Sequence, residues 1–148
     1  MKSCFFIGHR EASEDILPVL LRTIEQHITE YGVTEFIVGS YGGFDRLVAH
    51  ALIETKKHYP HIILTLLLAY HPGERPVIMP QGFDQTFYPP GMENVPRRYA
   101  IVRANRYMVD HVDRLISYAW HLASNARNLV EYAQKRLGRG LIITSIPK

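Results

Sequence analysis

Short apolar runs alternate along the chain with longer segments in which apolar residues recur every three or four positions. The first pattern is typical of buried β-strands and the second of amphipathic α-helices. Between Glu14 and Tyr31, for example, Ile16, Leu20 and Ile24 share one helical face. The short runs predict five strands, at Lys2–Gly8, Glu35–Gly39, His61–Ala69, Arg114–Tyr118 and Gly140–Ile146.

Helical segments lie between these runs, with one long interruption. Tyr70–Pro96 contains six prolines and three glycines, so we expect a Pro-rich loop insertion at 70–96 that serves as a lid or binding loop. Strands alternating with helices predict an α/β fold, a Rossmann-like three-layer sandwich with a mostly parallel five-stranded sheet and helices on both faces. The predicted helices are Glu14–Tyr31, Phe44–Tyr59, Arg97–His111 and Ser124–Leu137, the last capped by Gly138.

Size and composition place these elements in a single domain, 1–148. The chain has 148 residues, of which 47% are hydrophobic and 21% charged, as in folded soluble proteins. No apolar run reaches the roughly 18 residues that a membrane helix needs, and the first residues lack a signal-peptide pattern. Cys4 is the only cysteine, which excludes an intramolecular disulfide. We therefore expect a cytoplasmic protein with no membrane partner.

In a parallel sheet, ligands bind beyond the carboxyl ends of the strands, so the loops that follow strands are the candidate site. The first such loop is Gly8–His9–Arg10. Arg10 stands where its guanidinium can clamp an anion. The alternative is an ion pair between Arg10 and a nearby carboxylate, Glu11 or Glu14.

The second loop has three glycines directly before a predicted helix, which frees backbone N–H groups to face a phosphate. Asp45 either caps this helix or accepts a ribose hydroxyl. The loop matches neither the triphosphate-binding Gly-Lys-Ser/Thr pattern nor Gly-x-Gly-x-x-Gly. The phosphate-binding candidates here are Gly39, Ser40, Gly42, Gly43 and Phe44.

The loop after the fourth predicted strand opens another helix with small or polar residues, among them Ala123, Ser124 and Asn125. Ser124 is a plausible N-cap, a role compatible with ligand contact through neighbouring N–H groups. Trp120, the only tryptophan, either stacks on a base or belongs to the core or an interface.

Four arginines fall within ten residues, and they form either a solvated helix face or, through Arg106 above all, part of the ligand site. Histidines are scattered without the spacing of a zinc set, so no metal ion and no cofactor are expected. The arginines are Arg97, Arg98, Arg103 and Arg106.

Three segments together resemble the SLOG superfamily, which takes its name from the Smf/DprA DNA-processing proteins and the Lonely-guy phosphoribohydrolases. They are Ile7–Arg10, Gly42–Asp45 and Arg103–Val109, and the resemblance is to the small single-domain YpsA-like members. It implies a Rossmann-like fold that binds nucleotides or nucleotide-derived ligands, such as ADP-ribose derivatives. It also implies a sensor role in phage defence and a homo-oligomer.

One departure from the family bears on activity. In the hydrolase branch, the loop after the fourth strand carries Pro-Gly-Gly-x-Gly-Thr followed by a catalytic glutamate. Here Leu122–Arg127 has no glycine, and Glu131, the candidate catalytic residue, lies one turn further into the helix. The sequence therefore favours binding of a nucleotide-derived ligand over the alternative, cleavage of the N-glycosidic bond of nucleoside monophosphates.

A third hypothesis is single-stranded nucleic-acid binding through the arginines and loop aromatics. The net charge of +3, from 17 Lys and Arg against 14 Asp and Glu, makes it the least favoured.

Overall fold

The computed structural model describes residues 2–135 and 140–148. Within them, a six-stranded sheet has the order β4-β3-β2-β1-β5-β6, and every neighbouring pair is parallel. The α/β class is confirmed, and the expected count of five strands is corrected to six. The strands are β1 (Lys2–Gly8), β2 (Val33–Val38), β3 (Ile63–Leu67), β4 (Gln85–Phe87), β5 (Arg114–Tyr118) and β6 (Ile142–Ser145).

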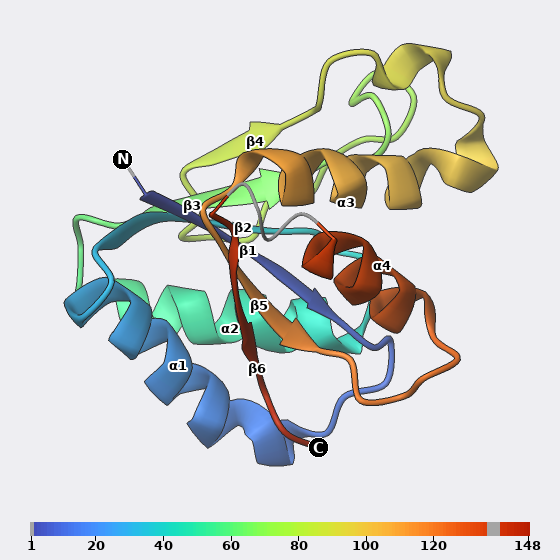
Figure 1. Ribbon diagram of the computed structural model, residues 1–148. Coiled ribbons are helices and arrows are strands. Elements are labelled where there is room, and N and C mark those ends of the chain that lie inside the picture. The colour runs from blue at the N-terminus through green and yellow to red at the C-terminus, as the bar shows by residue number, and fades with distance from the viewer. Residues whose placement is uncertain (1, 136–139) are drawn as a thin grey trace.

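Helices cover both faces of the sheet, as a three-layer sandwich requires (Figure 1). On one face lie α1 (Leu17–Thr29) and α2 (Gly43–Lys56), and on the other α3 (Ala100–His111) and α4 (Asn125–Gln134). Successive residues of a strand point to opposite faces, so in β1 Phe6 enters the core under α1 and α2. Its neighbour Phe5 enters the core under α3 and α4.

The helices begin and end close to the predicted positions, with differences of a few residues. The first starts as a 3-10 turn, η1 (Glu14–Ile16), and continues as α1 with Pro18 in its first turn, where proline is tolerated. Two further 3-10 turns are η2 (Met92–Asn94) and η3 (Arg97–Tyr99), the latter leading into α3. The predicted end of the last helix and its Gly138 cap lie outside the described residues.

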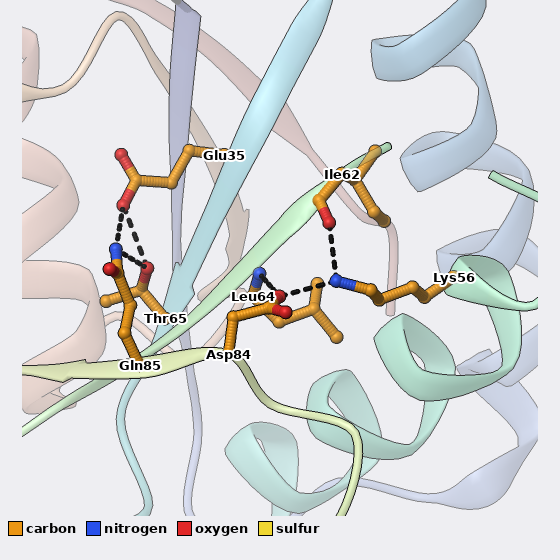
Figure 2. A network of polar contacts seen from close by, with 7 residues as sticks. All are labelled: Glu35, Lys56, Ile62, Leu64, Thr65, Asp84 and Gln85. Atoms are coloured by element: carbon orange, nitrogen blue, oxygen red, sulfur yellow. Dashed lines mark hydrogen bonds and ion pairs between the residues drawn. The ribbon is translucent and has the colours of Figure 1, made fainter. Parts of the chain in front are cut away.

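The segment 70–96 is not only a loop, because it contains β4 at one edge of the sheet. Two polar groups join β4 to its neighbours (Figure 2). Glu35 Oε2 accepts hydrogen bonds from Thr65 Oγ1 at 2.8 Å and Gln85 Nε2 at 3.3 Å. Asp84, directly before β4, accepts from Leu64 N–H at 2.7 Å and pairs with Lys56 Nζ at 2.6 Å. β4 therefore pairs in parallel with β3, and polar side chains from distant parts of the chain add to that pairing.

The order in which strands are added to the sheet changes side at β1. The strands β2, β3 and β4 follow one another on one side of β1, and β5 and β6 lie on its other side. The loops after β1 and β5 therefore leave the sheet on either side of a switch point, where open α/β sheets form ligand-binding crevices.

Within the residues that the structure describes, no helix has the length and apolar character needed to cross a membrane. The same residues contain no group of three or more His, Cys, Asp or Glu arranged to hold a metal ion.

Candidate functional site

A cavity of about 620 Å³ lies at the switch point between β1 and β5. The end of β1 and the loop after it form one wall, the β5–α4 loop and the first turn of α4 a second, and α3 a third. The volume is within the range of about 300–1,000 Å³ that is typical of small-molecule sites.

Many of the residues selected from the sequence meet in this cavity. It is also lined by residues that were not among the predicted site residues, chiefly Glu11, Tyr41, Asn105 and His121. The lining residues that the sequence predicted are Gly8, His9, Arg10, Asp45, Arg106, Trp120, Ala123, Ser124 and Asn125.

The glycine-rich loop after β2 is used for packing. Gly43 N–H donates to Arg10 O at 2.7 Å, and Phe44 N–H donates to His9 O at 3.3 Å. A Cβ on Gly43 would lie 2.5 Å from Arg10 O, and one on Gly8 would lie 2.2 Å from the Phe44 ring. These glycines let α2 approach the end of β1, so the N–H groups of Gly43 and Phe44 are not open to a phosphate.

The five phosphate-binding candidates predicted on this loop and at the start of α2 do not reach the cavity. Gly39, Ser40, Gly42, Gly43 and Phe44 are all absent from the cavity lining that the structure describes. The phosphate position that the sequence predicts on this loop is thus separate from the cavity.

Tyr41 in this loop and Asp45 in the first turn of α2 do line the cavity, and Asp45 is the acid of the two. Its Oδ2 accepts a hydrogen bond from Tyr41 N–H at 3.1 Å, so the carboxylate reaches back past the N-cap, Gly42. Among the described residues, Oδ1 has no hydrogen-bond donor. Burial raises the pKa of Asp45 to about 6, and the Tyr41 N–H and the Arg46 charge only partly oppose this effect. The cavity therefore contains a carboxyl group that titrates close to neutral pH.

His9 joins the two loops that flank the switch point. Its Nε2 accepts a hydrogen bond from His121 N–H at 3.1 Å. The ring makes edge contacts with Trp120, at a centroid distance of 5.0 Å, and Tyr118, at 5.6 Å. Burial first, and then the neighbouring His121, lower the pKa of His9 below its ordinary value, so the ring is neutral at neutral pH.

Three arginines bring positive charge to the cavity: Arg10 from the β1 loop, and Arg98 and Arg106 from the α3 side. Among the described residues none of them forms an ion pair, so Arg10 is not paired with a nearby glutamate. Of the other two clustered arginines, Arg97 pairs with Glu74 at 2.9 Å and Arg103 is exposed outside the lining. Of the four clustered arginines, Arg97 is therefore in an ion pair, Arg103 lies outside the lining, and Arg98 and Arg106 line the cavity.

The helix N-terminus at the cavity belongs to α4 rather than α2. The predicted cap is confirmed, because Ser124 Oγ accepts from Arg127 N–H at 3.0 Å. Asn125 and Ala126 line the cavity, and first-turn N–H groups have no intrahelical acceptor. These N–H groups and the positive end of the helix dipole add to the positive potential of the arginines.

Glu131 lies away from this arrangement. Its carboxylate is 3.6 Å from Arg127 Nε, its side chain is 54% exposed, and it is absent from the described lining. The segment 70–96 does not close over the cavity either, since none of its residues is part of that lining. The acids at the cavity are Asp45 and Glu11.

Comparison with known proteins found no matching family model and no similar curated protein. The resemblance to the SLOG superfamily stays a prediction, and the cavity itself is the basis for a functional proposal.

Proposed function

We propose that the protein binds a nucleotide or nucleotide-derived ligand in the switch-point cavity and acts as a sensor or ligand-binding module. The ligand class is ADP-ribose-like or nucleoside monophosphate, and the resemblance to the SLOG superfamily adds a role in phage defence. The observation that carries the proposal is the cavity of about 620 Å³ at the β1–β5 switch point, lined by an indole and by three arginines that form no ion pair with the described residues.

The lining offers a partner for each part of such a ligand. Arg10, Arg98 and Arg106 supply charge-assisted donors for phosphate, supported by the first turn of α4. Trp120 is 41% exposed at the cavity, and Lys148 Nζ lies 4.3 Å from the centroid of its ring, so a base would stack on the face of the indole opposite Lys148. The open Oδ1 of Asp45 accepts a sugar hydroxyl.

Several of these contacts must act together. A helix dipole contributes only about 0.3–1 kcal/mol, whereas a dissociation constant of 1 mM already corresponds to about 4 kcal/mol. A hydrogen bond to a charged group contributes about 1.5–3 kcal/mol, so two arginines with the dipole reach the affinity range of metabolite binding.

Thermal unfolding with AMP, ADP-ribose, cyclic ADP-ribose, NAD, other nucleoside monophosphates and short single-stranded DNA tests the proposal. A ligand at 100 times its dissociation constant adds about 2.7 kcal/mol, which raises the Tm of a domain of this size by roughly 5–11 °C. Quenching of Trp120, the only tryptophan, then reports binding at the cavity directly. A shift with DNA alone, steeply salt-dependent, favours nucleic-acid binding instead.

Arginine variants locate the site. Arg10→Ala and Arg106→Ala are expected to weaken binding of the responding nucleotide about 10- to 100-fold, since each removes a charged donor. Arg103→Ala is the matched control, because Arg103 is on the same helix as Arg106 and equally classed as exposed, but is absent from the described lining. No response to any nucleotide, or equal affinity in all three variants, contradicts the proposal.

Hydrolysis of an N-glycosidic bond is a second candidate, favoured by one observation: Asp45, with its pKa raised to about 6, lines the cavity. In this reaction the bond from C1′ to the base breaks through an oxocarbenium-like transition state, water adds to C1′, and the base leaves with a proton. A carboxyl group is needed beside the sugar. Release of free base from nucleoside monophosphates, abolished in Asp45→Asn and retained in Glu131→Gln, would support hydrolysis. Absence of release above background would exclude it for these substrates.

Self-association is part of the proposal as well. Tyr99, Val102 and Leu122 are exposed, and each lies at or next to a lining residue of the cavity. Sedimentation velocity over a range of protein concentrations tests it, and a monomer at all concentrations contradicts it.

A further inference from the structure

We infer that His9 is a positioning residue for the cavity, acting through both ring nitrogens. Nε2 holds the β5–α4 loop by accepting His121 N–H, and Nδ1 presents its proton to an acceptor atom of the ligand. The role of Nδ1, which we call the ligand half of the inference, rests on the proposed function. The role of Nε2, the loop half, does not.

The backbone of His9 fixes where its ring lies. His9 N–H donates to Tyr118 O at 3.2 Å, and His9 O accepts from Phe44 N–H at 3.3 Å. The residue is thus attached to β5 on one side and to α2 on the other, and it is only 9% exposed. A ring anchored in this way is a rigid support for a loop.

The partner of Nε2 determines the tautomer. A backbone N–H can only donate, so the bond from His121 N–H at 3.1 Å requires a lone pair on Nε2. A neutral ring then carries its proton on Nδ1. Among the described residues Nδ1 has no hydrogen-bond partner, although His9 lines the cavity. The acceptor that matches this donor is a phosphate oxygen, a carbonyl oxygen or a ring nitrogen of the ligand.

The bond at Nε2 continues into the helix that faces the ligand. His121 O accepts from Ser124 Oγ at 2.7 Å, and Ser124 Oγ accepts from Arg127 N–H at 3.0 Å. His9 thus connects through His121 and Ser124 to the first turn of α4, where Asn125 and Ala126 line the cavity. Without the acceptor on His9, this chain of contacts loses its hydrogen bond to the loop after β1.

The same bond makes the site sensitive to acid, since a protonated ring has no lone pair for His121 N–H. The titratable groups around the ring are Tyr118 on β5 and His121 in the β5–α4 loop. Arg10 follows His9 along the chain, and the cavity acids are Asp45 and Glu11. Burial and His121 hold the pKa of His9 below 6.5, so the bond persists at neutral pH and is lost in more acidic solution.

Three substitutions separate the two roles of the ring. In His9→Gln the side-chain oxygen reaches the Nε2 position and keeps the loop contact, but the Nδ1 donor is lost. In His9→Asn an amide donor stays near Nδ1, but the loop contact is lost, and His9→Phe removes both. His71→Gln is the matched control, because His71 also accepts a backbone N–H, from Gly73 at 2.9 Å, and is absent from the described lining.

The first measurement needs no ligand. Long-range proton–nitrogen NMR of the histidine rings, with the His9 signals assigned from the variants, is expected to show the neutral Nδ1–H tautomer. Hydrogen exchange of the His121 amide is expected to accelerate at least tenfold in His9→Asn and His9→Phe and to stay near wild type in His9→Gln and His71→Gln. The Nε2–H tautomer, or unchanged exchange in His9→Phe, overturns the inference.

The second measurement uses AMP and ADP-ribose as probes, followed by Trp120 fluorescence. Affinity is expected to fall about tenfold in His9→Gln and in His9→Asn, and further in His9→Phe. Acidification is expected to weaken binding more in wild type than in His9→Gln, a comparison that separates His9 from Asp45. Equal affinity in His9→Gln and wild type overturns the ligand half alone. If wild type binds neither probe, the ligand half falls with the proposed function, and the exchange and tautomer data still decide the loop half.

Discussion

Two aspartates at opposite ends of the strands have contrasting surroundings. We call the side of the sheet where the parallel strands begin the amino edge, and the side where they end the carboxyl edge. At the amino edge, Asp84 Oδ2 accepts Leu64 N–H at 2.7 Å and Lys56 Nζ at 2.6 Å. Burial alone would raise the pKa of Asp84, but these two partners outweigh it and hold the pKa below its usual value. At the carboxyl edge, Asp45 accepts only the Tyr41 N–H among the described residues, and burial raises its pKa to about 6.

The neighbours of each aspartate repeat the contrast. Around Asp84, the side chains of Glu35, Thr65 and Gln85 satisfy one another (Figure 2). Around Asp45, the cavity contains Arg10 and Glu11, and neither side chain has a hydrogen bond or an ion pair with the described residues. Polar groups that are fully paired hold strands together, whereas open ones cost stability and are retained where a ligand completes them. The difference supports a structural role for the polar groups at the amino edge and supports the ligand binding proposed for the carboxyl edge.

The largest effect on stability is expected for a substitution at Gly8, where β1 and α2 pack together at the carboxyl edge. In Gly8→Ala the new Cβ would lie 2.2 Å from the Phe44 ring, which is completely buried. Either β1 or α2 must shift, so we expect a loss of about 3 kcal/mol in the free energy of unfolding, measured with urea. Gly73→Ala is the control, because its Cβ would meet only the His71 side chain, at 3.1 Å. A loss below about 1 kcal/mol would show that Gly8 is not a packing residue.

Asp45→Asn is expected to stabilise the protein. Because the folded pKa of Asp45 is raised from 3.8 to about 6, its contribution is most favourable below pH 3.8 and declines as the pH rises to about 6. Asparagine keeps an acceptor for Tyr41 N–H and carries no charge. We expect a gain of about 2 kcal/mol at pH 8 and little change at pH 4, from urea unfolding at both values. A loss of stability at pH 8 would remove the electrostatic distinction between the two edges.

The contrast also explains which parts of the fold the sequence could predict. The structure has β5 at Arg114–Tyr118, the predicted bounds, and this strand, covered on both faces, is buried along its whole length. By contrast, β4 spans three residues, two of them exposed, and no local pattern distinguishes it from a loop. Its contacts come from distant parts of the chain: Lys56 pairs with Asp84, directly before β4, and Glu35 accepts a hydrogen bond from Gln85.

The candidate site was predictable to the extent that position determines it. His9, Arg10 and Ser124 follow strands, and the carboxyl ends of parallel strands share one edge. A glycine at the start of a helix, such as Gly43, indicates that another group lies close to the backbone there. The sequence does not tell whether this group is a phosphate or another part of the protein. In the structure it is Arg10 O. The bond between His9 and His121 joins residues 112 positions apart, so only the folded chain reveals it.

Asp84→Asn is expected to have the opposite sign to Asp45→Asn and a smaller size. The lowered pKa of Asp84 gives stability that is present above the unfolded pKa and is lost as the pH falls through the folded value. Since the carboxylate is 39% exposed, solvent screens the pair with Lys56, and we expect a loss of about 1 kcal/mol at pH 7. The same urea titrations at pH 7 and in acid measure it. A stabilising effect at pH 7 would contradict the structural role.

The smallest effect on stability is expected for Glu131→Gln. This variant also tests whether Glu131 belongs to the ligand site. Glu131 contacts Arg127 four residues earlier in α4, at 3.6 Å, and such exposed pairs contribute about 0.3–0.5 kcal/mol. Because Glu131 is outside the described lining, ligand affinity from Trp120 fluorescence should match wild type, while Asp45→Asn weakens it. A loss of binding in Glu131→Gln that exceeds the loss in Asp45→Asn would move the functional acid from α2 to α4.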